Sequence, residues 1–203
     1  MLTYLTLGIT FAFAAAIEPG PLQAYLLSQT LAHGWQRTIL ASFAPILSDV
    51  PIIAVCLFIL SHVPSAFLQS LQIIGGIYLI YLAVEAIRTY RNYKAEQALQ
   101  PSSQNTLVKA VVVNLLNPNP YLAWSLVMGP LLIKAWQETP IDGVALITAF
   151  YATMVVCLFG TIMLFSAFRN LGAVINRILI GVSGIALGGF GLFEIWTGVS
   201  ALL

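Results

Sequence analysis

Residues 2–31 read LTYLTLGITFAFAAAIEPGPLQAYLLSQTL, an apolar run that Glu18, Pro19, Gly20 and Pro21 interrupt near its middle. A run of about 20 apolar residues is long enough to cross the hydrocarbon core of a bilayer as a helix. Proline breaks such a helix, because it has no N–H group and its ring clashes with the carbonyl four residues back. The stretch therefore predicts a transmembrane helix that is interrupted inside the membrane.

The composition of the whole chain indicates the same environment. Its 203 residues include eight Lys and Arg and seven Asp and Glu, and 60% are hydrophobic. The mean hydropathy is +0.94. A soluble domain is about one quarter charged and about half apolar. The composition therefore excludes a soluble enzyme, a disordered chain, a nucleic-acid binder and a disulfide scaffold, and it predicts an integral membrane protein without a cofactor.

The chain contains six apolar runs of helical length, and we expect an all-α protein in which each run spans the membrane. Their continuity excludes the short alternating strands of a membrane barrel. The first run is expected to be retained, because residues 1–17 lack the Lys or Arg of a signal peptide. The six runs cover residues 2–31, 38–61, 66–87, 107–133, 143–168 and 173–203.

The Lys and Arg residues predict the orientation of these helices. Loops rich in Lys and Arg stay on the cytoplasmic side of a membrane. Seven of the eight Lys and Arg lie in or beside the loops that follow the first, third and fifth runs, and the exception is Lys134. We therefore expect those three loops in the cytoplasm and both termini outside. The other cations are Arg37, Arg88, Arg91, Lys94, Lys109, Arg169 and Arg177.

Short matching segments indicate an internal repeat. They occur in the same order in both halves of the chain, with slowly growing spacing, which favours a duplication over chance. The pairs are PGP at 19–21 with PNP at 118–120, VCLF at 55–58 with 156–159, and GI at 76–77 with 184–185.

The duplication predicts two halves of three helices, residues 1–88 and 107–203, joined by a polar cytoplasmic linker at 89–106. With three helices in each half, the second half is inverted relative to the first. Such a 3+3 inverted-topology repeat is typical of secondary transporters, which bind their substrate near the midplane on interrupted helices. In this chain helices 1 and 4 carry the interruptions.

Three polar features reach about the same depth in different helices, at about 1.5 Å of rise per residue. They are Glu18, Asp49 and Asn117. We therefore expect the substrate site between helices 1, 2 and 4. Gln23, Tyr25 and Trp124 are near enough to line it, but aromatic and packing residues of this kind are more often structural. The expected binding residues are Glu18, Pro19, Gly20, Pro21, Asp49, Asn114, Asn117, Pro118, Asn119 and Pro120.

Glu18 and Asp49 are the strongest functional candidates. A central acidic residue costs about 2.5–3.5 kcal/mol on membrane-insertion scales. All Lys and Arg lie at helix ends or in loops, so neither acid has a cation at its depth. Each must be protonated, hydrated in a cavity, or paired with a transported cation. Both are therefore candidates for coupling transport to a proton gradient.

Four other residues are expected to be structural. Glu85 lies three residues before Arg88, and we expect an ion pair at the membrane surface. Glu194 lies near the outer end of its run and is expected to reach the headgroups. Cys56 and Cys157 lie on separate helices and are expected to pack as small apolar side chains.

The ordered set of motifs resembles the LysE/RhtB family of amino-acid exporters. These motifs are PGP at 19–21, Asp49, GGIYLIYL at 75–82 and NLLNP at 114–118. The resemblance covers nearly the whole chain. It implies efflux of amino acids or similar small metabolites from the bacterial cytoplasm, driven by an ion gradient.

The chain departs from that family pattern at three positions. Glu18 stands where a small or hydroxyl residue is usual, Asn119 replaces the usual Lys, and Pro45 replaces a common Gly. One negative charge gained and one positive charge lost shift the site toward cationic substrates. This raises the expectation of a cationic amino acid or a metal ion.

The sequence therefore predicts a multi-pass exporter of the bacterial cytoplasmic (inner) membrane, a proton-coupled antiporter of amino acids that needs no nucleic acid. An alternative is a divalent-cation exporter that adds the side-chain oxygens of Asn114 and Asn117 to the two carboxylates, since hard cations prefer oxygen ligands. A remote alternative is a thiol–disulfide relay through Cys56 and Cys157. For the predicted exporter, the expected partners are a small-molecule substrate and the lipid bilayer, and a homodimer is left open.

Overall fold

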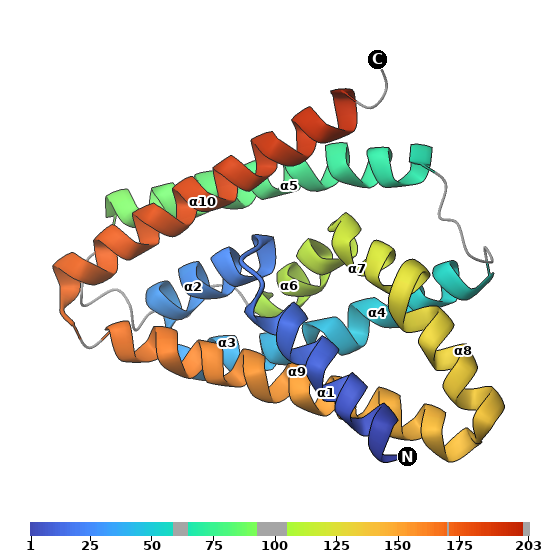
Figure 1. Ribbon diagram of the computed structural model, residues 1–203. Helices are drawn as coiled ribbons and strands as arrows, with labels where there is room; N and C mark the ends of the chain where they lie inside the picture. Colours follow the sequence, from blue (N-terminus) through green and yellow to red (C-terminus); the bar gives the residue numbers. More distant parts are fainter. Residues whose placement is uncertain (59–64, 93–104, 170, 201–203) are drawn as a thin grey trace.

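A computed structural model describes residues 1–58, 65–92, 105–169 and 171–200, and these residues contain helices and no strands. Part of the expected linker, residues 93–104, lies outside the described residues. The helices run mostly along one long direction (Figure 1). In order they are α1 Leu2–Ile17, α2 Pro21–His33, α3 Trp35–Thr38, the 3₁₀ helix η1 Ile39–Phe43, α4 Ala44–Phe58, α5 Ser65–Asn92, α6 Thr106–Leu115, α7 Pro118–Ala123, the π-helix η3 Trp124–Met128, α8 Gly129–Glu138, α9 Pro140–Arg169 and α10 Ala173–Ser200.

Four stretches of helix in the described chain are long and apolar enough to cross a membrane. A fifth span results if α1 and α2 are counted together, although they meet at an angle of 64°. The chain is therefore an integral membrane protein. The four stretches are Trp35–Cys56, Ala66–Asn92, Pro140–Phe168 and Ala173–Ser200.

The break expected in the first apolar run is present. α1 ends at Ile17 and α2 begins at Pro21, with Glu18 in extended conformation between them. Pro21 occupies the first position of α2, where the missing N–H costs no hydrogen bond and the fixed backbone angle suits a helix start. The local chemistry of the two prolines therefore accounts for the bend.

The fourth apolar run is also broken, and more extensively than expected. α6 is a helix of ten residues that ends at Leu115, and α7 starts at Pro118. α7 then continues through the π-helical turn of η3 into α8. Single π-helical turns are common near functional sites. Since this path contains no long apolar helix, the sixth span remains a prediction.

Glycines lie where α5 and α10 pack against each other. A Cβ atom built on Gly76 of α5 would lie 2.6 Å from the Gly191 carbonyl oxygen of α10, and one on Gly191 would lie 2.7 Å from the Gly76 carbonyl oxygen. Gly184 faces Ala86 and Ile87 of α5 at similarly short range. Small residues let transmembrane helices approach this closely. The glycines of α10 therefore pack α10 against α5.

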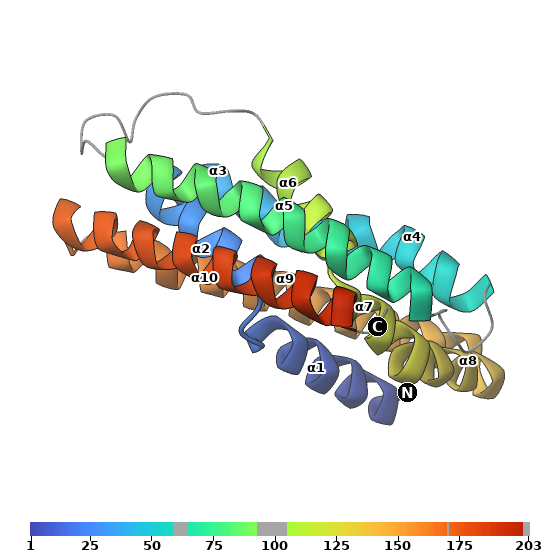
Figure 2. The same ribbon diagram turned by 90° about the horizontal axis from the view of Figure 1, so that it is seen from above.

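The two ends of the molecule can be distinguished along its long direction. At one end the Met1 amino group forms an ion pair with the Asp142 carboxylate at the start of α9. At the other, the Arg177 guanidinium of α10 donates to the Tyr90 carbonyl of α5 at 3.0 Å, near the turn at Gly34. We call these the Met1 end and the Gly34 end. Figure 2 shows α5, α9 and α10 extending between them.

Candidate functional site

Both helix breaks face one cavity of about 370 Å³, which we call the central cavity. The end of α1, the start of α2, and the segment between α6 and α7 all contribute to its lining. The remaining walls come from α4, from α7 with η3, and from α9. The discontinuities that the sequence places in two distant segments therefore meet at one site.

The Asp49 carboxylate is buried at the side of this cavity, with 4% of the residue exposed. The Trp124 indole N–H donates to one of its oxygens at 3.2 Å, and the Tyr151 hydroxyl donates to the same oxygen at 3.1 Å. The Asn114 side-chain amide donates to the other oxygen at 3.2 Å. Donors from η3, α9 and α6 thus fix a carboxylate carried by α4.

Asn114 connects this carboxylate to a second acceptor. Its amide also donates to the Ser48 hydroxyl at 2.7 Å, and that hydroxyl donates to the Ala44 carbonyl at 2.9 Å. Asn114, Ser48 and Asp49 are all buried. Buried polar groups are costly unless they are hydrogen-bonded. The last turn of α6 is therefore held to the middle of α4 by a continuous polar network.

Glu18 supplies the second acidic group of the central cavity. Its backbone N–H donates to the Ala14 carbonyl at 3.2 Å and ends α1, and the residue itself is exposed. Among the described residues, no Lys, Arg or His lines this cavity. The cavity is therefore acidic, and the cation-favouring character expected from the sequence is consistent with its lining.

Each break is spanned by a side chain that donates back across it. The Gln23 amide of α2 donates to the Ala16 carbonyl at the end of α1. The Tyr121 hydroxyl of α7 donates to the Leu115 carbonyl at the end of α6, at 3.0 Å. Carbonyls released at a helix end within a membrane need such partners. Both breaks are therefore bridged by a side-chain donor, which is an amide at the first break and a hydroxyl at the second.

Asn117 determines where the second broken helix restarts. Its side-chain oxygen accepts from the Asn119 backbone N–H at 3.0 Å, which is a helix N-cap. The following residue, Pro118, takes the first helical position and is buried there. The NPNP sequence therefore combines a cap with a proline start.

Eight of the ten expected binding residues line the central cavity, and two do not. Pro19 is exposed between the two half-helices, and Pro118 is buried at the first position of α7. These two prolines shape the breaks without facing the cavity. The eight lining residues are Glu18, Gly20, Pro21, Asp49, Asn114, Asn117, Asn119 and Pro120.

The apolar walls of the central cavity were not anticipated. Phe150, Met154 and Leu158 come from α9, and the part of its sequence between residues 143 and 168 carries no charge to attract attention. Tyr151, which binds Asp49, lies on the same helix. A tyrosine in the middle of a charge-free apolar run was the one available signal. Gln23 and Trp124 line the cavity, whereas Tyr25 does not.

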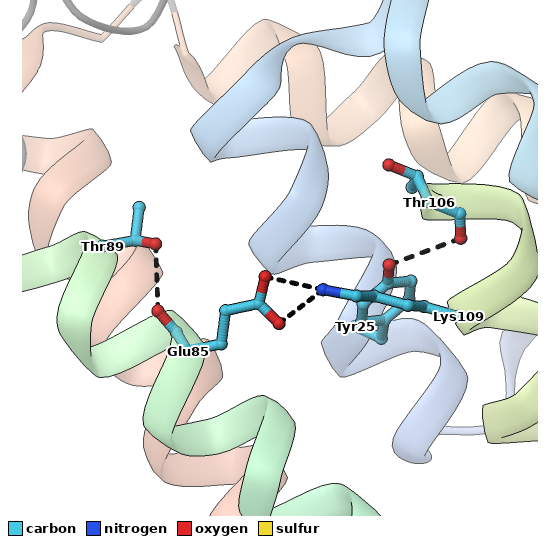
Figure 3. A network of polar contacts seen from close by, with 5 residues as sticks. All are labelled: Tyr25, Glu85, Thr89, Thr106 and Lys109. Carbon is cyan, nitrogen blue, oxygen red and sulfur yellow. Dashed lines mark hydrogen bonds and ion pairs between the residues drawn. The ribbon is translucent and has the colours of Figure 1, made fainter. Parts of the chain in front are cut away.

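A separate polar network lies between the breaks and the Gly34 end. The Lys109 ammonium of α6 donates to both oxygens of Glu85 on α5, at 2.6 and 2.7 Å (Figure 3). The expected Glu85–Arg88 pair is therefore wrong. The nearby Tyr25 hydroxyl of α2 donates to the Thr106 carbonyl at the start of α6, at 3.3 Å. These contacts join three helices on one side of the breaks.

The central cavity extends in the other direction. Phe11 lines it from the part of α1 that lies toward Met1, and Val127 lines it from the path that continues into α8. Neither Tyr25 nor Lys109 contributes to its lining. The cavity therefore lies at the breaks and reaches toward the Met1 end, while the Tyr25 and Lys109 contacts lie on the Gly34 side of it.

Glu194 does not have the position expected from the sequence. One of its carboxylate oxygens is buried, and the residue lines a second, small cavity together with Pro21 and Asn117. We call this space the rear cavity. The prediction that Glu194 reaches the headgroups is therefore wrong, because α10 brings this residue against the two helix breaks.

Two further expectations concern metals and thiols. Within the described part of the chain, no three His, Cys, Asp or Glu side chains gather closely enough to hold a metal ion. Cys56 and Cys157 are both free. The Cys56 sulfur lies 3.5 Å from the Tyr121 carbonyl oxygen and packs beside the second break.

Comparison with known families decides the assignment. The family model described as LysE type translocator matches residues 13–198, which is most of the chain. The chain belongs to the LysE type translocator family. The resemblance to the LysE/RhtB family is thereby confirmed, and membership implies export of amino acids or other small molecules across a membrane. No curated protein and no solved structure matches the chain.

Proposed function

We propose that this LysE type translocator is a secondary exporter of amino acids, cationic ones foremost, from the bacterial cytoplasm. The observation that carries the proposal is the central cavity, where two broken helices meet two acidic groups and no lining cation among the described residues. Its volume of about 370 Å³ lies in the range of small-molecule sites. An amino acid with a second amino group fits this charge.

The two functional groups of an amino acid find complementary surfaces in this cavity. An ammonium group is attracted by Asp49, by Glu18 and by the carbonyl end of α1. The carboxylate is attracted by the N-terminal end of α2, where Gly20 and Leu22 line the cavity. The N-terminal end that follows Pro120 offers a second such surface. The apolar side chains of α9 then cover the aliphatic part of the substrate.

The arrangement of cavity and contacts supports an outward-facing state. The positive-inside rule assigns the Gly34 end to the cytoplasm and the Met1 end to the outside. The central cavity reaches from the breaks toward the Met1 end, and the Glu85–Lys109 and Tyr25–Thr106 contacts lie between it and the Gly34 end. Alternating access then requires these contacts to open while the Met1 side closes.

An inverted repeat supplies a route for that exchange. In this scheme residues 1–88 and 107–203 rock against each other around the fixed breaks. α6 of the second half contacts α5 of the first through Lys109 and Glu85. In the same scheme, the equivalent movement of the other half brings α1 toward α10 and closes access to the cavity from the outside.

The proton gradient drives export in this proposal. Protonation of Glu18 or Asp49 from the outside removes a negative charge that holds the ammonium group. The cargo then leaves, and the proton is carried inward on the return step, which makes the protein an antiporter. The carboxylates thus act on the cargo through charge alone.

Uptake into inside-out vesicles tests the proposal. Vesicles containing the protein receive labelled lysine, arginine, leucine, Mn²⁺ and Ca²⁺ under an imposed proton gradient, with protein-free vesicles as the control. The proposal predicts gradient-dependent accumulation of lysine or arginine. Accumulation of a metal ion without any amino acid supports the divalent-cation alternative and contradicts the proposal.

A further inference from the structure

We propose that Glu194 is a proton-binding site separate from the central cavity and coupled to it through the two helix breaks. The inference rests on the proposed function for its role in transport, but the site itself can be tested without any cargo. It assigns a task to an acidic residue that the substrate does not reach, since Glu194 does not line the central cavity.

The rear cavity lies directly beside both helix breaks. Its volume is about 10 Å³, which is room for about one water molecule. Pro21 and Asn117 line it, and the same two residues line the central cavity from the other side. Pro21 begins α2, and Asn117 caps the start of α7. The two residues at which the helices restart therefore separate Glu194 from the substrate space.

Glu194 is a partly buried residue, and one of its two carboxylate oxygens faces the protein interior. Its Oε2 atom is shielded from solvent and has no hydrogen-bond partner among the described residues. Burying an ionised group without a partner is very costly. A proton on the carboxylate removes that charge. Asp49 differs, because its two oxygens already accept hydrogen bonds from three donors.

The walls of the rear cavity are mostly apolar. A hard metal cation collects several oxygen ligands, whereas Gly75, Leu79 and Val113 contribute apolar surface here. Tyr78 is the only other titratable residue that lines the rear cavity within the described chain. Glu194 is the one carboxylate in a lining that otherwise offers the Tyr78 hydroxyl, the Asn117 amide and apolar surface, which suits a proton better than a metal ion.

The charged groups on the neighbouring helices leave Glu194 available. α5 and α6 carry Glu85 and Lys109, which are paired with each other. α2 contributes Pro21 to the rear cavity, and α9 contributes no residue. A movement of the breaks, such as the one that exchanges access to the central cavity, alters the surroundings of Glu194 directly. Occupancy of the substrate site and protonation of Glu194 are thereby linked.

Infrared spectroscopy of the purified protein in lipid tests the site without cargo. A protonated carboxylic acid has a carbonyl band distinct from that of a carboxylate, and the band is followed through a pH titration. We expect a band that persists at neutral pH in the wild type and is lost in Glu194→Gln. Glu138→Gln, which changes an exposed acid at the end of α8, is the matched control and should retain the band.

Three results overturn the assignment. They are an unchanged band in Glu194→Gln, its loss in Asp49→Asn alone, and its loss on addition of sodium ions at constant pH. A melting curve of Glu194→Gln that matches the wild type excludes misfolding as the cause of a lost band.

Transport tests the coupling to cargo. With labelled lysine, Glu194→Gln should exchange substrate across the vesicle membrane at close to the wild-type rate and respond less strongly to the proton gradient. A response equal to that of the wild type contradicts the coupling. If wild-type vesicles transport none of the amino acids, the proposed function fails, while the infrared result still decides whether Glu194 binds a proton.

Discussion

The Tyr151 hydroxyl donates to the Asp49 carboxylate at 3.1 Å and so ties α9 to α4 at the level of the two helix breaks. Tyr151→Phe removes this donor and leaves Trp124 and Asn114 in place. A hydrogen bond to a charged group contributes about 1.5–3 kcal/mol. We therefore expect a lower free energy of unfolding, by about 2 kcal/mol, and weaker lysine binding, measured by denaturant titration and calorimetry. Tyr81→Phe, at an exposed position, should change neither quantity.

The two acids of the central cavity should respond differently to neutralisation. Asp49→Asn keeps the size of the side chain but removes the charge that the ammonium group meets. Because Asp49 is held by three donors, we expect this variant to lose lysine binding at every pH. Glu18→Gln, at an exposed position of the lining, should bind lysine several-fold more weakly. Wild-type binding and pH dependence in both variants contradict the proposed site.

Closing the second break should impair transport without unfolding the protein. Replacing Pro118 and Pro120 by Ala restores two backbone N–H groups and lets α6 continue toward α7. We expect a protein that still inserts and melts at or above the wild-type temperature, but transports lysine at a small fraction of the wild-type rate. A wild-type rate in vesicles would mean that the break is only a bend.

The Glu85–Lys109 pair should control access from the Gly34 end. Lys109→Gln leaves Glu85 without its cation and weakens the contact between α5 and α6. A cysteine introduced at Ala24, a buried position on α2, should then react several-fold faster with a thiol reagent in inside-out vesicles. The exchanged pair, Glu85→Lys with Lys109→Glu, should restore slow labelling. Equal rates in all three proteins argue against a closure at this pair.

The orientation of the protein in the membrane can be measured by labelling cysteines with a thiol reagent in intact cells. Single cysteines at Asn92 and Gln137 are placed in a variant that lacks Cys56 and Cys157. Both positions are exposed, and they lie toward opposite ends of the molecule. An impermeant reagent should label the cysteine at 137 and spare the one at 92. The reverse pattern inverts the topology and the direction of access.

Features with local causes were predictable from the sequence. The breaks follow from proline chemistry, so the ends of α1 and α6 fall where the prolines place them. The gathering of Glu18, Asp49 and Asn117 follows from depth, because a membrane fixes the position of a residue along each helix. Rotation about the helix axis is not fixed in this way, and Pro19 therefore does not face the cavity.

The predictions for Glu85 and Glu194 were wrong because residues distant in the sequence, and not neighbours on the same helix, surround these side chains. Arg88 lies one turn from Glu85 in the sequence, yet Lys109 from another helix takes both carboxylate oxygens. Glu194 is near the end of its helix in the sequence, but the packing of α10 places it beside Pro21. Neither result follows from a pattern within one helix. Tyr151 was missed because the apolar run around it, residues 143–168, has no charge as a guide.

Calorimetric titration of the purified protein with L-lysine tests the central claim most directly. The claim is that the acidic central cavity binds a substrate ammonium group at Asp49. The account predicts saturable binding to the wild type, no detectable binding to Asp49→Asn, and unchanged binding to Glu138→Gln. Equal lysine affinities in the wild type and in Asp49→Asn would contradict it.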